Sequence, residues 1–90
     1  MEVKLFANLA EEAGTRRVDV DLDGSATLED TLEAVFETHP GLREQVLDGD
    51  GNLVDHINVL VNGTAIDDGL DRNVDPSDEV AVFPPVSGGL

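Results

Sequence analysis

The residues of this sequence that could carry chemistry stand at its C-terminal end, Phe83-Pro84-Pro85-Val86-Ser87-Gly88-Gly89-Leu90. The two prolines fix φ and lack an N–H group, so they end strand pairing and stiffen the chain. The glycines that follow have no Cβ, which gives the backbone wide freedom and a very narrow cross-section. A stiff segment followed by a slim tip suits insertion of the chain end into a tunnel of another protein. The alternative is an ordinary frayed terminus.

Three oxygen-bearing side chains, at Asp48, Asp50 and Asn52, have part of the spacing of a calcium loop. Such a loop needs glycine at its sixth position and glutamate at its twelfth, where this sequence has Leu53 and Val59. We therefore interpret the segment as an acidic turn, and we expect no metal site in the protein.

The two histidines stand apart from any nucleophile. His39 falls where a helix is predicted to end, a position at which a histidine favourably meets the negative end of the helix dipole. His56 falls at the start of a predicted strand. The chain has no cysteine, which rules out disulfides, thiolate catalysis and cysteine-bound metals. We interpret both histidines as structural.

The charge of the chain narrows the class of partner. Its 90 residues include 20 Asp and Glu against 5 Lys and Arg, for a net charge of −15. Nucleic acid and acidic membrane surfaces are excluded as partners, because both need clustered Lys and Arg. Self-repulsion of this size would strain a small fold, whereas molar salt screens charges beyond about 3 Å. We expect a protein adapted to a high-salt cytoplasm; the alternative is a merely acidic mesophilic protein.

No apolar run approaches the roughly 20 residues that a membrane span needs, which predicts a soluble, cytoplasmic protein. Hydrophobic periodicity then predicts the elements that position the chain end. Thr27 offers an N-cap to a helix that should end before Pro40, and the Asn62-Gly63 pair predicts a hairpin. We expect strands over residues 2–7, 15–22, 57–61 and 79–83, an edge strand over 64–66, and helical segments over 8–14, 28–39 and 42–47.

The order of these elements is strand, strand, helix, strand, edge strand, strand, with one main helix to cover one sheet. If the first and last strands lie side by side at the centre, they run parallel and the crossover between them carries the helix. The sequence therefore predicts an α+β fold of the ubiquitin-like β-grasp type. Its mixed sheet should have four to five strands, residues 1–85 forming the domain and residues 86–90 a flexible diglycine tail.

Three large apolar side chains, Phe6, Leu60 and Phe83, fall on the face of the predicted strands that points away from the core. Together they would form an exposed apolar patch beside the tail on a heavily acidic surface. Such patches usually mark an interface with a partner. The alternative is that loops fold over these side chains and bury them.

The ending of the chain, residues 78–89, resembles that of the small subunit of molybdopterin synthase. Together with the strong acidity, the whole chain resembles the small archaeal modifier proteins of halophiles. The Phe-Pro-Pro-Val-Ser-Gly-Gly string is the specific part of this likeness, and the remainder is generic for a β-grasp. The likeness also covers Val3-Lys4-Leu5-Phe6-Ala7, Ala13-Gly14 and Ile57-Asn58-Val59-Leu60-Val61-Asn62-Gly63.

The resemblance implies a ubiquitin-like modifier and sulfur carrier whose reactive group is the terminal carboxylate of Gly89. A ubiquitin-activating-like enzyme would use ATP to adenylate it; this chain itself should bind no cofactor. Sulfur would then give a thiocarboxylate for the large subunit of molybdopterin synthase, or the carboxyl would be joined to lysines of target proteins. The chain, a monomer on its own, would be a carrier rather than a stand-alone enzyme. The tail neighbours would be Gly88 and Ser87, and the docking patch Phe6, Leu60 and Phe83.

Leu90 departs from the family pattern, which ends on the two glycines. Either a protease removes Leu90 before activation, or it is a residue added to the natural sequence, which we favour. A third interpretation of the chain is a non-covalent β-grasp interaction module in which the tail has no chemistry. Deletion of Gly88 and Gly89 distinguishes this module, which would keep its function, from a modifier or sulfur carrier.

Overall fold

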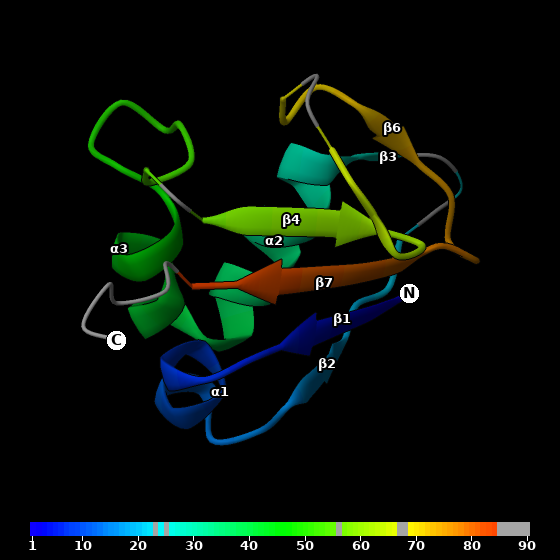
Figure 1. The fold of residues 1–90 in the computed structure, drawn as a ribbon. Coiled ribbons are helices and arrows are strands. Elements are labelled where there is room, and N and C mark those ends of the chain that lie inside the picture. The colour runs from blue at the N-terminus through cyan, green and yellow to red at the C-terminus, as the bar shows by residue number, and fades with distance from the viewer. Residues whose placement is uncertain (23, 25, 56, 67–68, 85–90) are drawn as a thin grey trace.

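The computed structural model describes residues 1–22, 24, 26–55, 57–66 and 69–84 of the chain (Figure 1). Their strands are β1 (Glu2–Leu5), β2 (Arg17–Asp19), β3 (Ala26–Thr27), β4 (Asn58–Val61), β5 (Thr64–Ala65), β6 (Asn73–Val74) and β7 (Glu79–Phe83). Their helices are α1 (Asn8–Ala13), α2 (Leu28–Thr38), the 3-10 helix η1 (Pro40–Leu42) and α3 (Arg43–Val46).

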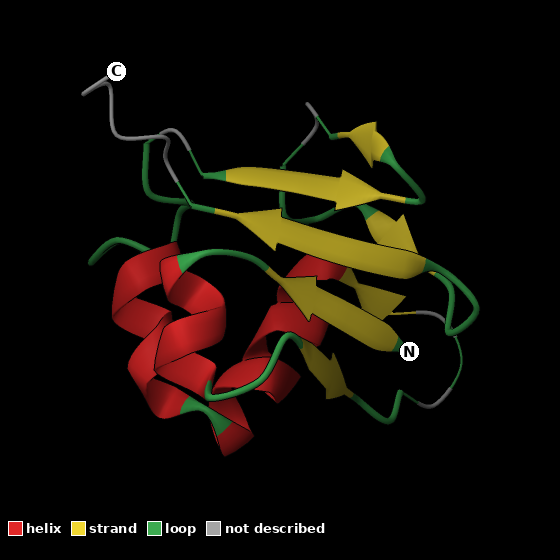
Figure 2. Cartoon of the chain, turned by 60° about the horizontal axis from the view of Figure 1, so that its bottom comes forward, coloured by secondary structure: helices red, strands yellow, loops and turns green. Residues whose placement is uncertain are grey.

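The central sheet has five strands in the order β2-β1-β7-β4-β5. β1 runs parallel to β7 and antiparallel to β2, and β4 runs antiparallel to both β7 and β5. The helices lie against one face of this sheet (Figure 2). The predicted α+β β-grasp, with its first and last strands parallel at the centre, is confirmed.

The core between sheet and helices is built almost wholly from aliphatic side chains. Val3, Val80 and Leu28 have no exposed surface, and Phe36 is the aromatic residue within it. The alternation expected of strands buried on one face holds in β1, β4 and β7. The inward side chains of these three strands are Val3, Leu5, Val59, Val61, Val80 and Val82.

Some predicted elements are shorter in the structure, and two strands were not predicted. The first strand ends at Leu5, because Ala7 has a φ of 53° that turns the chain into α1. β3 and β6 pair antiparallel in a separate two-stranded sheet, with Ala26 opposite Val74. Each has two residues, too few for any periodicity to appear in a sequence.

The start of α2 is fixed by its own cap and by the segment before β6. The Asp30 N–H donates to Thr27 Oγ1 at 3.1 Å, and the Thr27 N–H donates to Asp30 Oδ2 at 3.2 Å, which is a capping box. The N–H groups of Leu28 and Glu29 donate to the carbonyls of Arg72 and Leu70, respectively. The orphan donors of the helix start are thus satisfied, and the predicted N-cap is confirmed.

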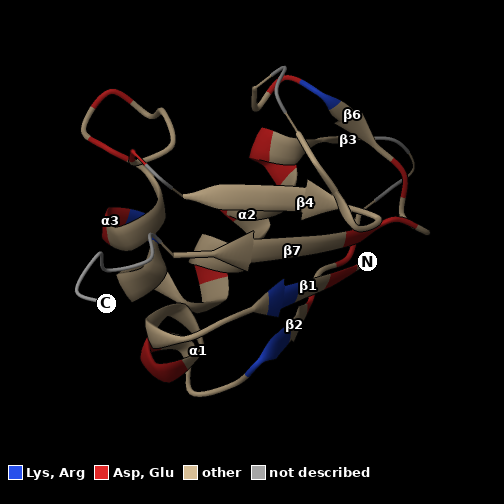
Figure 3. Ribbon diagram, viewed as in Figure 1, with Lys and Arg blue, Asp and Glu red and all other residues tan. Residues whose placement is uncertain are grey.

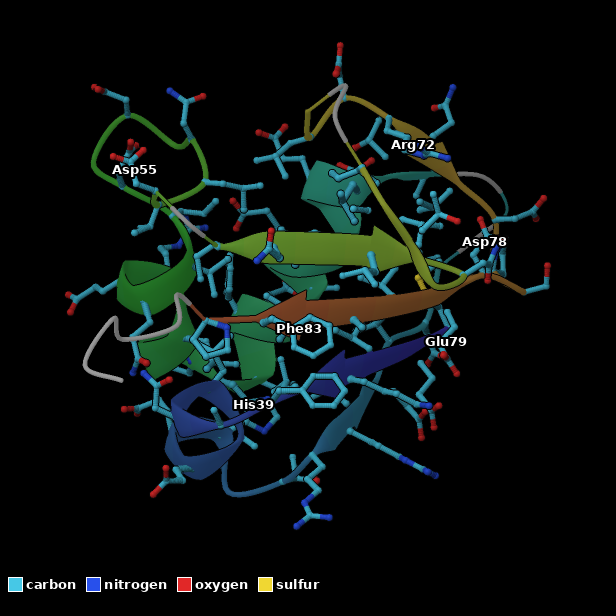
Figure 4. The ribbon with its side chains drawn as sticks, in the orientation of Figure 1. His39, Asp55, Arg72, Asp78, Glu79 and Phe83 are labelled. Carbon is cyan, nitrogen blue, oxygen red and sulfur yellow. The ribbon has the colours of Figure 1, made fainter. Side chains whose placement is uncertain are left out.

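The entry of β7 is fixed by a polar turn. The carboxylate of Asp78, labelled in Figure 4, accepts the Asp75 N–H at 2.8 Å and the Asn62 side-chain amide at 3.0 Å. The Asn62 side-chain oxygen accepts the Glu79 N–H, so the β4–β5 hairpin and the start of β7 are tied together. The hydrogen bond from Asp75, and next that from Asn62, hold the pKa of Asp78 below its ordinary value.

Replacing Thr27 with alanine removes one half of the capping box. We expect the Thr27→Ala variant to lose about 1 kcal/mol of unfolding free energy, because the Asp30 amide loses its acceptor. Chemical denaturation measures this loss. Thr27→Ser keeps the hydroxyl and should lie within about 0.5 kcal/mol of the original chain; equal losses in both variants would show that the hydrogen bond is not the cause.

Candidate functional site

Two phenylalanine rings stack on the outer face of the sheet, at the point where β7 ends. The ring centroids of Phe6 and Phe83 lie 4.1 Å apart and the ring planes are inclined by 12°. Phe83, labelled in Figure 4, is the last residue of β7, and Phe6 follows β1 directly in the sequence. The parallel register, which places Leu5 beside Val82, brings the two rings together. Strands from opposite ends of the chain thus build one aromatic site.

Leu60 lies on the same face of the sheet, on the other side of β7. It is opposite Ala81, and Phe83 is opposite Asn58, so Leu60 and Phe83 are diagonal neighbours on antiparallel strands. Such neighbours are about 7–8 Å apart, within reach of long side chains. The three residues Phe6, Leu60 and Phe83, here called the apolar patch, therefore share one surface, as predicted.

The apolar patch is open to solvent at Phe6 and partly covered elsewhere. Phe6 is 37% exposed, the highest value for a large hydrophobic residue in the described ranges, and Leu60 and Phe83 are half-buried. The alternative prediction, burial under loops, is therefore wrong for Phe6. The turn at Ala7 and the hydrogen bond from the Leu9 N–H to the Phe6 carbonyl set the position of this residue.

An ion pair lies beside the apolar patch on the same face. Lys4 Nζ is 3.2 Å from a carboxylate oxygen of Glu79, and each side chain is partly exposed. Lys4 of β1 is paired with Ala81 of β7, and Leu60 of β4 is paired with the same Ala81 from the other side of β7. The patch thus has a polar rim toward the start of β7, as interfaces with a buried apolar centre usually have.

The residues predicted to carry the chemistry lie outside the described residues. These are Ser87, Gly88, Gly89 and Leu90. The last described residue, Pro84, follows Phe83 directly and is half-buried. The structure therefore places Pro84, which leads toward the predicted tail, next to Phe83 of the apolar patch, and the predicted boundary between domain and tail at residue 85 stays a prediction.

The other sequence candidates have structural partners where they are described. Asp48 Oδ1 accepts the N–H groups of Asp50 and Asn52, at 2.9 and 3.1 Å, as a turn-forming carboxylate does. His39 caps α2 through its N–H to the Val35 carbonyl, and its Nδ1 lies 2.8 Å from Thr38 Oγ1. His56 lies outside the described residues.

A group of basic residues near Phe6 was not among the sites predicted from the sequence. Lys4, Arg16 and Arg17 line a groove together with Leu5 and Phe6. The signal was present in the sequence as two adjacent arginines in a chain with only five basic residues. No single strand shows the group, because it forms only where β1 and β2 pair.

None of the helices among the described residues has the length and apolarity required to cross a bilayer.

The sequence also matches known proteins along its length. The model of the ThiS family matches residues 3–89. Small archaeal modifier protein 1 of Haloferax volcanii is 55% identical over 89 residues, which are 99% of this chain and 100% of the relative. The crystal structure of SAMP1 from Haloferax volcanii has a TM-score of 0.89 and covers 99% of this chain and 98% of its own.

Two further solved structures have the same fold at lower identity. A putative molybdopterin converting factor, subunit 1, from Pyrococcus furiosus is 30% identical, with a TM-score of 0.74, over 94% of this chain and 95% of its own. A chain of the BexX/CysO complex of Amycolatopsis orientalis is 25% identical, with a TM-score of 0.83, over 98% of each chain.

The stacked rings should stabilise the fold as a coupled pair. In a double-mutant cycle of Phe6→Ala and Phe83→Ala, we expect a coupling free energy of about 0.5–1.5 kcal/mol, the usual value for an aromatic pair. Chemical denaturation of the four proteins gives this value. Phe6→Ala combined with Leu60→Ala is the control, because β7 separates these residues, and their effects should add within about 0.5 kcal/mol.

Proposed function

Because the chain belongs to the ThiS family, we propose that it is a ubiquitin-like protein modifier and sulfur carrier, activated at the carboxylate of Gly89. The observation that carries the proposal is the family match itself, which runs through both glycines of the tail and reaches residue 89. The relatives named as a modifier protein and as a molybdopterin converting factor subunit support the two roles.

Activation makes the carboxylate an electrophile. An oxygen of the Gly89 carboxylate attacks the α-phosphate of ATP in a partner enzyme, pyrophosphate leaves, and a mixed anhydride with AMP remains. This adenylating enzyme supplies the nucleotide site, and the chain itself holds no cofactor. Residues 88 and 89 present no side chain to the narrow site that such a reaction requires.

One activated carboxyl serves both roles. Hydrosulfide from the sulfur donor displaces AMP and leaves a thiocarboxylate and a proton. The thiocarboxylate can then donate its sulfur within the large subunit of molybdopterin synthase. A lysine amine of a target protein that displaces AMP instead forms an isopeptide bond and loses a proton. The chain contains no cysteine, so sulfur is carried on the carboxyl rather than on a side chain.

The apolar patch docks these partners. Phe6, Leu60 and Phe83 lie on one face, and Phe83 is followed by Pro84, the last described residue before the tail, so a partner that covers the patch is in reach of the chain end. The adenylating enzyme and the large subunit would use this surface in turn, because there is one tail to deliver. The relative in the BexX/CysO complex supports a chain that works in association with a partner protein.

The protein works as a monomer in a high-salt cytoplasm. The net charge of −15 and the relative from Haloferax volcanii support this setting. Leu90 lies beyond the family match, and the reactive form of the chain ends at Gly89. A non-covalent interaction module remains the second candidate, supported by the exposed Phe6 ring alone.

Deletion of the glycines tests the proposed function. With the adenylating enzyme of the same organism, ATP and a sulfur donor, the chain lacking Leu90 should gain the mass of sulfur in place of oxygen. With the chain lacking residues 88–90, no pyrophosphate should be released from ATP and no sulfur should be gained, because the Gly89 carboxylate is missing. Intact mass spectrometry of the two chains measures whether each has gained sulfur. The interaction-module interpretation predicts instead that neither chain is activated, while partner binding survives the deletion.

A carboxylate in the apolar patch should prevent docking. We expect Phe83→Asp and Leu60→Asp to raise the Kd for the adenylating enzyme at least about tenfold, because a charge is placed where apolar contact is made. Binding calorimetry measures the change. Asn73→Asp on β6 adds the same charge at an exposed position of the second sheet and should change the Kd less than about twofold. Unchanged binding by both patch variants would contradict the docking role.

A further inference from the structure

The positive charges of the chain are gathered unevenly. The sequence has five Lys and Arg residues against 20 Asp and Glu. Three of the five, Lys4, Arg16 and Arg17, belong to the adjacent strands β1 and β2 and to the residue before β2. Figure 3 shows this blue region on the neighbouring strands β1 and β2, while acidic residues, in red, are scattered over the other elements and the remaining blue segments lie apart, on α3 and beside β6. A strongly acidic protein thus has one basic corner.

These three basic residues line a groove, and Phe6 of the apolar patch lines it as well. A cavity of about 190 Å³ is lined by Lys4, Leu5, Phe6, Arg16 and Arg17. Its apolar lining includes Phe6, the exposed residue whose ring stacks on that of Phe83. The hydrogen bond from the Leu5 N–H to the Arg16 carbonyl, 2.8 Å long, holds the two sides of the groove together.

The two arginines of the groove are available to a partner. Arg17 lies 3.7 Å from a Glu2 carboxylate oxygen, and its side chain is 67% exposed. Exposed pairs of this kind contribute little to stability and are readily exchanged for another carboxylate. Arg16 is exposed and forms no ion pair within the described residues. Its guanidinium therefore contacts no carboxylate in the described part of the protein.

The pairing of the strands also places like charges together. Lys4 and Arg17 are directly opposite each other in the antiparallel pair of β1 and β2, and residues so paired point to the same face. Like charges at such positions destabilise a sheet. Their closest carboxylates, on Glu79 and Glu2, come from the adjacent rows of the sheet. An acidic group entering the groove would add to the partial compensation that Glu79 and Glu2 provide.

We propose that this groove binds an acidic segment of the partner protein, whose carboxylates pair with Arg16 and Arg17 while an apolar side chain covers Phe6. The inference rests on the proposed function, because the partner is the adenylating enzyme that receives the tail. The groove sets the orientation in which that enzyme docks: a charged contact at β1 and β2 and an apolar contact at β7 fix the chain at two points.

High salt removes the long-range repulsion that would oppose this contact. In molar salt the screening length is about 3 Å, so the net charge of −15 no longer repels an acidic partner from a distance. Pairs in direct contact keep part of their attraction, because solvent ions are excluded between them. Charge recognition in such a setting depends on close, correctly placed cations, and the groove supplies them at the edge of the apolar patch.

Charge reversal in the groove tests the inference. The assay is ATP–pyrophosphate exchange by the adenylating enzyme of the same organism, with the full chain lacking Leu90 as the varied substrate. We expect Arg16→Glu and Arg17→Glu each to raise the KM for the chain about tenfold and to leave kcat within about twofold, because docking and not chemistry is affected. Arg17→Lys keeps the charge and should keep the KM within about threefold.

The matched control is Arg43→Glu, which makes the same change of charge on α3, where Arg43 contacts Glu33 and the Phe36 ring. Its KM should change less than about twofold, and thermal melts verify that all variants are folded. Equal increases for Arg17→Glu and Arg43→Glu would assign the effect to net charge and overturn the inference, as would an unchanged KM for both groove variants. If the original chain is not activated at all, the proposed function fails, and the inference fails with it.

Discussion

Parallel pairing between β1 and β7 joins the two ends of the chain at the centre of the sheet. Parallel neighbours cannot be connected by a tight turn, so the chain must leave the sheet and return, and α2 lies in that crossover. Val3 and Val80, which are paired in this ladder, have no exposed surface. The core under the sheet and the Phe6–Phe83 stack above it both depend on this single pairing.

The pleat of the sheet divides the apolar residues between stability and recognition. Inward positions of β1, β4 and β7 are valine or leucine, so the core beneath them is filled by aliphatic side chains. The sequence has only three phenylalanines, and two of them stack on the outward face instead. Aromatic rings contribute large contact areas at interfaces. The fold thus keeps two of its three aromatic rings outside the core, on the face of the sheet that a partner can reach.

Sequence patterns predicted the structural features that depend on local sequence. They did not predict the features that depend on pairing between distant segments. The alternation in the strands, the Thr27 cap and the Asn62-Gly63 hairpin are local signals, and the structure has all three. The β3–β6 pair is set by the docking of the α2 start on residues 70–74, which no local pattern reveals. The apolar patch was predictable from strand phase, since outward residues of neighbouring strands share a face. The basic groove was not, because it requires the register of β1 and β2.

The position of β7 has a mechanical consequence for any protein to which this chain is attached. A pulling force on the tail acts along β7, which is bonded on one side to β1 and on the other to β4. Load applied along a central strand shears both ladders, so many hydrogen bonds resist together instead of opening one at a time. The domain should therefore resist mechanical unfolding from the tail. An unfolding enzyme that pulls on the tail would meet its greatest resistance at β7, the first strand that it reaches.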